Sequence, residues 1–228
     1  MIDWLNYSLR DFLMFGSEVY WRLFALHNQA HWPLPVVAIA LGLAILLLMA
    51  APNGPRRRLT GLLMALSWVG AAHFLATRYA PINWPMAYAA WAFAAEAVMI
   101  APLTMYGAPA QARPATRLAG GIGLAVFAYV LLLHPFVGLL FGRPLSQAEL
   151  FGLAPDPTAL ASLGLVLLIG RSRWRVALSV IPVVWCVVSA ATLFALGEPQ
   201  GLMLVFVLGL WGAGMVSGAT RATWRGQR

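Results

Sequence analysis

Seven stretches of mostly apolar residues follow one another along the chain, and short polar connections separate them. A helix needs about 20 apolar residues to cross the hydrocarbon core of a bilayer. All but the fifth stretch come close to that length or exceed it. The pattern therefore predicts an all-α polytopic membrane bundle of about seven spans. The predicted spans are 33–51, 59–77, 85–106, 118–141, 158–170, 176–196 and 201–219.

The fifth stretch, Thr158 to Gly170, is too short to cross a bilayer alone. It is either a half-helix that dips into the membrane or a short helix that its neighbours shield. Ser146 and Glu149 have the spacing of a capping box, which predicts a short surface helix ahead of this stretch. Asp156 is predicted to cap the short span itself.

The first 32 residues are too polar to cross a membrane. Ser17 can cap a helix from Glu18 to about Ala30, which is predicted to be amphipathic. Its predicted apolar face consists of Val19, Leu23, Leu26 and Ala30. The chain then divides into an extracytoplasmic amphipathic segment at 1–32, a single transmembrane bundle at 33–219 and a basic tail at 220–228.

The fifteen arginines are distributed unevenly over the connections. Every second connection between the predicted spans lies on the same side of the membrane, which gives two sets. One set holds four arginines, Arg10, Arg22, Arg78 and Arg143, together with six of the seven acidic residues. The other set holds eleven, from Arg56 to the C-terminal Arg228. Because positively charged loops stay in the cytoplasm, the asymmetry predicts an outside N-terminus and a cytoplasmic C-terminus.

The composition, 61% hydrophobic and 10% charged, excludes a water-soluble domain. The net charge of +8 lies in short connections, where topology and anionic lipid headgroups explain it. The expected partner is therefore the lipid bilayer and not nucleic acid. Cys186 is the single cysteine, which excludes a disulfide within the chain.

Two histidines, His27 and His31, lie four residues apart on the predicted outer helix. At this spacing both imidazoles point the same way and can share a transition metal such as zinc or copper. Asn28 stands where a helical zinc protease needs glutamate, so protease activity is not supported. The alternative is a pair of interfacial histidines that bond to headgroups, carbonyl groups or water.

Glu96 is the only acidic residue well inside a predicted span. A carboxylate at that depth is costly and should face the bundle interior with a partner, or else be protonated. His73 and His134 lie late in two outward-running spans, and either can be that partner. Arg78 and Asn83 follow in the next outer connection and can complete a polar mouth for ligand binding or proton coupling.

Glycines recur on two predicted spans, as Gly214 and Gly218 and as Gly120, Gly121 and Gly123. Such faces let helices approach closely. They can serve packing within the bundle, a homo-oligomer, or contact with another membrane protein.

Short motifs occur along nearly the whole chain. They are His27-Asn28, Trp32-Pro33, Ala72-His73-Phe74, His134-Pro135, Phe151-Gly152, Pro155-Asp156-Pro157-Thr158, Ile181-Pro182 and Gly197-Glu198-Pro199-Gln200. Together they resemble a bacterial membrane-protein family known only as a domain of unknown function, number 6064. The resemblance implies a multi-pass protein of the bacterial inner membrane, with no activity attached. The family's usual Pro-Cys-Pro-Thr reads Pro-Asp-Pro-Thr here.

Three hypotheses for function follow from these residues. The first is binding or transport of a small solute or metal ion through a polar site open to the extracytoplasmic side, with no enzymatic activity. The second is a non-catalytic subunit of a larger membrane complex. The third is a membrane-embedded metalloenzyme that uses the same histidines.

Overall fold

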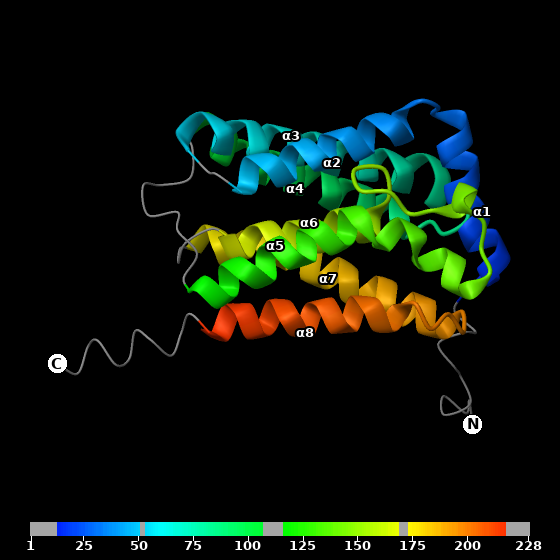
Figure 1. Ribbon diagram of the computed structural model, residues 1–228. Coiled ribbons are helices and arrows are strands. Elements are labelled where there is room, and N and C mark those ends of the chain that lie inside the picture. The colour runs from blue at the N-terminus through cyan, green and yellow to red at the C-terminus, as the bar shows by residue number, and fades with distance from the viewer. Residues whose placement is uncertain (1–12, 51–52, 107–115, 169–172, 218–228) are drawn as a thin grey trace, which may run out of the picture.

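Helices run side by side along one axis, and α1 lies across one end of them (Figure 1). The computed structural model describes residues 13–50, 53–106, 116–168 and 173–217. All regular secondary structure in these residues is helical, which confirms the predicted all-α class. The elements are α1 (Ser17–Ala30), α2 (Leu34–Ala50), α3 (Gly54–Phe74), η3 (Leu75–Tyr79), α4 (Met86–Tyr106), α5 (Arg117–Leu132), η4 (His134–Phe141), η5 (Leu145–Gln147), α6 (Pro155–Leu168), α7 (Arg173–Ala195) and α8 (Gly201–Ser217).

Two helical stretches, Gly54–Tyr79 and Trp174–Ala195, are long and apolar enough to cross a membrane. Two bent pairs also qualify when each pair is counted as one span: α1 with α2, bent by 93°, and α5 with η4, bent by 56°. The second bend lies at Pro135, whose ring nitrogen has no hydrogen to donate to the preceding turn. The described part of the chain thus holds two to four candidate spans, judged by length and composition.

Arginines gather at one end of the bundle. Helices α3, α5 and α7 all begin next to arginines, at Arg56, Arg117 and Arg173. Figure 1 places these three beginnings at the end opposite α1. We call the two ends the arginine-rich end and the α1 end. The arginine-rich helix starts, which lie in alternate connections along the sequence, therefore come together at one end of the fold.

Helix α6 lies at the centre of the bundle. It packs against α3, α5, α7 and α8, and nearly all of its side chains are buried. Gly123 of α5 and Gly164 of α6 let the two backbones touch, since a Cβ at Gly164 would stand 2.7 Å from the carbonyl oxygen of Gly123. The short fifth stretch is thus a helix that its neighbours shield. Gly214 likewise packs inside the chain, against Leu167, while Gly218 lies outside the described residues.

The buried face of α1 differs from the predicted one. Val19 and Leu26 are more than 40% exposed, although we expected both to be covered. Aromatic side chains take their place because they stack on Phe74 and Tyr79 at the end of the α3 segment. Ser17 does not cap the helix, whose N-cap is Gly16. The buried residues of α1 are Tyr20, Trp21, Leu23, Phe24 and His27.

The segment before α6 also departs from the prediction. In place of a capped surface helix there is one 3-10 turn, η5, and Glu149 is buried with 3% of its surface exposed. Glu149 turns inward because Gln200 offers it a hydrogen-bond donor there. Asp156 does not cap α6 in the predicted way either, since its carboxylate accepts hydrogen bonds from Trp185 and Ser189 of α7.

Candidate functional site

Three of the four histidines meet where α1 crosses the end of α3. His27 lies in the last turn of α1, His31 is the C-cap residue of that helix, and His73 comes from α3. The Nε2 atoms of His31 and His73 lie 3.2 Å apart. The ring centroid of His27 lies 4.3 Å from that of His31 and 6.0 Å from that of His73. We call these residues the histidine cluster. Of the predicted site residues, the structure brings these three together.

The members of the histidine cluster differ in exposure. His27 is buried and its Nδ1 has no hydrogen-bond partner among the described residues, whereas His73 is exposed. Burial, followed by the nearby His31, His73 and Arg78, lowers the pKa of His27 to about 4. The His27 ring is therefore neutral at physiological pH.

Arg78 and Asn83 were predicted to form a polar mouth. Arg78 lies in η3, beside the histidine cluster, and Asn83 lies in the turn after η3. Arg78 acts on His27 as a positive charge, and its Nε has no hydrogen-bond partner within the described ranges. The backbone N–H of Asn83 donates to the carbonyl group of Tyr79 at 3.0 Å. Among the described residues, no set of three or more histidine, cysteine, aspartate or glutamate side chains stands, as placed, in an arrangement that could hold a metal ion.

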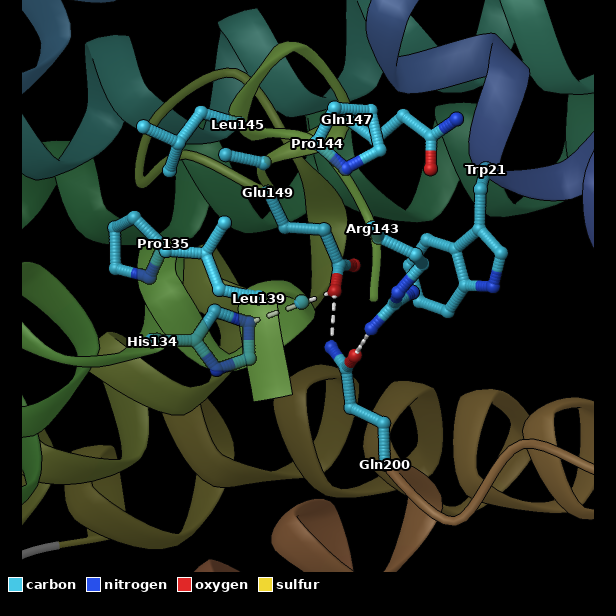
Figure 2. A pocket seen from close by; sticks show the side chains of 12 residues that line it. Trp21, His134, Pro135, Leu139, Arg143, Pro144, Leu145, Gln147, Glu149 and Gln200 are labelled. Carbon is cyan, nitrogen blue, oxygen red and sulfur yellow. Dashed lines mark hydrogen bonds and ion pairs between the residues drawn. The ribbon is translucent and has the colours of Figure 1, made fainter. Parts of the chain in front are cut away.

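The fourth histidine, His134, belongs to a separate group around Glu149. Gln200 donates from Nε2 to Oε2 of Glu149 at 2.6 Å, and Nε2 of His134 lies 3.6 Å from the same oxygen. Tyr129 contacts the other ring nitrogen of His134 at 3.3 Å. Figure 2 shows the His134, Glu149 and Gln200 side chains converging on one point, although they come from three separate segments.

Arg143 completes this group from the loop after η4. It donates from Nη2 to the amide oxygen of Gln200, and its guanidinium carbon lies 3.3 Å from the ring centroid of Trp21. Such a cation–π contact is stronger where water is excluded. Burial lowers the pKa of Arg143, and the negative charges of Glu149 and Glu198 oppose that shift.

These residues line a small pocket at the α1 end, which we call the Glu149 pocket (Figure 2). The space between its side chains has room for about one water molecule. Five buried polar atoms of its lining have no hydrogen-bond partner among the described residues, and such atoms normally have one. They are Trp21 Nε1, His134 Nε2, Arg143 Nε, Arg143 Nη1 and Glu149 Oε1.

Helix α1 holds the loop that carries Glu149. The Asn28 side chain donates to the carbonyl oxygens of Ser146 at 3.1 Å and Ala148 at 3.0 Å. Trp21, from the same helix, forms one wall of the Glu149 pocket. Helix α1 therefore closes the pocket, and the C-terminal end of the same helix carries His27 and His31.

A second buried carboxylate, Asp156, lies at the start of α6. Its two oxygens accept hydrogen bonds of 2.7 Å from Trp185 Nε1 and Ser189 Oγ. Tyr20 of α1 lies within electrostatic reach: burial first, and then the charges of Asp156 and Glu149, raise its pKa well above the ordinary value. Asp156 is thus fully partnered, in contrast to Glu149.

Glu96 stands apart from both groups. It is 1% exposed, and neither of its carboxylate oxygens has a hydrogen-bond partner in the described part of the chain. The predicted pairing with His73 or His134 is therefore absent there. The reason is depth: both histidines lie at the α1 end, whereas Glu96 lies near the middle of α4. Phe93, one turn before Glu96, contacts Trp68 of α3 and packs edge-to-face against Trp185 of α7, so Glu96 follows on the face of α4 that is turned to these two helices.

Sequence reasoning missed Trp21, Arg143 and Gln200 as pocket residues. Arg143 stood out only as one of the four arginines in the less basic set of connections. Gln200 belongs to the motif Gly197-Glu198-Pro199-Gln200 between two predicted spans, but the motif did not indicate a contact with Glu149. These residues are far apart in the chain, so only the arrangement of α1, η4 and α8 could reveal them.

An apolar groove adjoins the Glu149 pocket and shares three residues with it: Pro135, Leu145 and Ala148. It has a volume of about 580 Å³ and opens between the α1–α2 bend and η4. Its other walls are mostly apolar, for example Trp32, Ile39, Phe136 and Leu150.

Comparison with known proteins bears on the family alone. No curated protein and no solved structure matches the chain. The profile of one family, described as a family of unknown function (DUF6064), covers residues 17–224. That range includes every residue of the histidine cluster and of the Glu149 pocket. The chain therefore belongs to the DUF6064 family.

Proposed function

We propose that the protein is a seven-span protein of the bacterial inner membrane that binds and transports a small polar solute from the extracytoplasmic side. The seven spans are α2, α3 with η3, α4, α5 with η4, α6, α7 and α8. The apolar character of these helices and the arginine-rich end support this topology, because positive connections stay in the cytoplasm. In this orientation the Glu149 pocket faces outside.

The orientation can be tested with single cysteines. Cys186 is fully buried, and Cys186→Ser supplies a background without a reactive thiol. In that background, Gln29→Cys at the α1 end should react on intact cells with a membrane-impermeant maleimide. Arg58→Cys at the arginine-rich end should react only after the membrane is permeabilised. The reverse pattern contradicts the proposed orientation.

One observation carries the solute-binding proposal: the side chains that line one small pocket have five buried polar atoms without a hydrogen-bond partner among the described residues. Each buried donor or acceptor left unpaired costs about 1–3 kcal/mol, so a bound group that pairs with them is favoured. Four of the atoms are N–H groups or ring nitrogens, and one is a carboxylate oxygen. The complementary solute is small and polar, and it both accepts and donates hydrogen bonds.

Glu149 and His134 can couple solute binding to protons. Their facing atoms lie 3.6 Å apart, too far for a direct hydrogen bond and close enough for one charge to influence the other. A proton on Glu149 removes the negative charge that balances Arg143 and so changes the affinity for a solute. Glu96 is the second proton-binding group of the proposal, because an unpaired carboxyl group at that depth favours its protonated form.

Binding can be measured by thermal stabilisation of the detergent-purified protein. Ammonium, urea, formate, acetate and bicarbonate are suitable probes: ammonium has the size of the one water molecule for which the pocket has room, and the other four bind only if the side chains around that space move apart. At least one should raise the Tm of the wild-type protein, since a ligand that binds only the folded state stabilises it. Glu149→Gln and Arg143→Gln should abolish that shift. Glu18→Gln, an exposed site on α1, is the matched control and should keep it.

Transport can be measured in proteoliposomes that contain a pH-sensitive dye. The active probe should carry protons inward with the wild-type protein and more slowly with Glu149→Gln or Glu96→Gln. No Tm shift with any probe, together with no proton movement, contradicts the proposal. A partner protein that co-purifies in fixed ratio under those conditions identifies a subunit of a larger complex instead.

A further inference from the structure

The Nε2 atoms of His31 and His73 already stand at the separation of two ligands of one metal ion. In tetrahedral zinc sites each imidazole nitrogen lies about 2.0–2.1 Å from the metal, which places neighbouring nitrogens about 3.3 Å apart. The observed separation is 3.2 Å. An ion seated between the two nitrogens therefore needs little movement of either helix.

The ring of His31 is oriented as a metal ligand requires. Its Nδ1 lies 3.0 Å from the carbonyl oxygen of His27, one turn earlier on α1. A proton on Nδ1 then donates to that carbonyl group, so the lone pair of Nε2 points to the side of His73, where it accepts a hydrogen bond from His73 Nε2 that a metal ion would replace. Metal-bound histidines usually make this second hydrogen bond, which fixes the tautomer and the ring plane.

His27 can supply the third ligand. The ring centroids of His27 and His31 lie 4.3 Å apart, and those of His31 and His73 lie 5.2 Å apart. Since Nδ1 of His27 has no hydrogen-bond partner among the described residues, the ring can turn without breaking a bond at that atom. As placed, the three rings are not a complete ligand set. The inference therefore includes a rotation of the His27 ring and a water molecule as the fourth ligand.

The chemistry of the ligands indicates which ions the cluster suits. Imidazole binds a metal only when unprotonated. The ligands are nitrogens alone, which suits zinc, copper or nickel better than magnesium or calcium. His73 is exposed, so the cluster is not enclosed on that side.

We propose that His27, His31 and His73 form a binding site for a divalent transition-metal ion of the zinc class at the α1 end, separate from the Glu149 pocket. The ion would link the last turn of α1 to the end of α3. The site does not depend on the proposed transport function, because no residue of the cluster lines the Glu149 pocket.

The test uses full-length protein with any polyhistidine tag removed and metal stripped by a chelator. Zinc is titrated against a chromogenic chelator, and Co²⁺ serves as a spectroscopic probe of the ligand geometry. The wild-type protein should bind one zinc per chain and give the intense visible bands of tetrahedral Co²⁺. His31→Gln and His73→Gln should each weaken zinc binding at least about tenfold and remove those bands, and His27→Gln should weaken binding similarly.

His134→Gln is the matched control, since it removes the one histidine outside the cluster. It should keep the stoichiometry, the affinity and the Co²⁺ spectrum. Size-exclusion profiles and Tm values without metal show that each variant is folded. Equal affinity in His31→Gln and wild type, or zinc that binds at many weak sites, overturns the proposal. Unchanged affinity in His27→Gln overturns the three-histidine ligand set.

Discussion

Gln200 donates a hydrogen bond of 2.6 Å to Glu149, and the same side-chain amide accepts one from Arg143. A neutral side chain thus separates a buried carboxylate from a buried guanidinium group and satisfies one atom of each. The two charged residues lie on the segment between η4 and α6, and Gln200 directly precedes α8. The contact therefore joins that segment to the last helix of the bundle.

Removal of this amide should destabilise the protein strongly. Gln200→Ala leaves Glu149 Oε2 and Arg143 Nη2 buried without the partner they have now, which should cost about 2–4 kcal/mol. The measurement is the free energy of unfolding in a mild detergent. Gln29→Ala, at an exposed glutamine of α1, should change it by less than about 0.5 kcal/mol. Equal effects of the two substitutions contradict the role assigned to Gln200.

The contact between α5 and α6 gives a second prediction. In Gly164→Ala the new methyl group meets the carbonyl oxygen of Gly123, so the helices must separate, which should cost about 1–3 kcal/mol. Gly121→Ala, in α5, is the control, because nothing lies within 4 Å of the position that its Cβ takes. That variant should be stabilised by about 0.5–1 kcal/mol through helix propensity. Thermal unfolding of the two variants, measured side by side, should move in opposite directions.

The sequence could predict the helices but not their neighbours. Apolar runs and prolines placed the elements to within a few residues, because the period and length of a helix are local properties. His27 and His31 share a helix face for the same local reason. That His73 joins them depends on α1 crossing α3, and this crossing follows from aromatic packing of Tyr20 and Phe24 that no spacing rule gives.

Glu149 shows why the rest could not be predicted. Its spacing from Ser146 matches a capping box, so a local rule favoured a surface helix. The structure instead pairs Glu149 with Gln200, 51 residues away. A buried hydrogen bond to a charged group outweighs a helix cap of about 1 kcal/mol. Glu96 shows the converse: its burial was predicted from its place in a span and is confirmed, whereas neither predicted histidine partner contacts it among the described residues.

The Asp156 site allows a matched comparison of two serines on α7. Ser189 Oγ donates to a buried carboxylate, whereas Ser179 Oγ donates to the carbonyl group of Arg175 one turn earlier. Ser189→Ala should cost about 1.5–3 kcal/mol, because hydrogen bonds to charged groups contribute that much. Ser179→Ala should cost less than about 1 kcal/mol, since its bond only duplicates a local backbone contact. Chemical unfolding of both variants tests the difference, and an equal cost excludes an ionised Asp156.

Tyr20 should make the protein sensitive to alkaline pH. Its pKa is raised in the folded state by burial and by the charges of Asp156 and Glu149, whereas an unfolded tyrosine titrates near pH 10. Above about pH 10 the unfolded chain releases this proton and the folded protein keeps it, so stability falls as pH rises. Below that pH the contribution is fully present. Tyr20→Phe should flatten the decline in Tm between about pH 10 and 12, while Tyr88→Phe, at an exposed tyrosine of α4, should leave it unchanged.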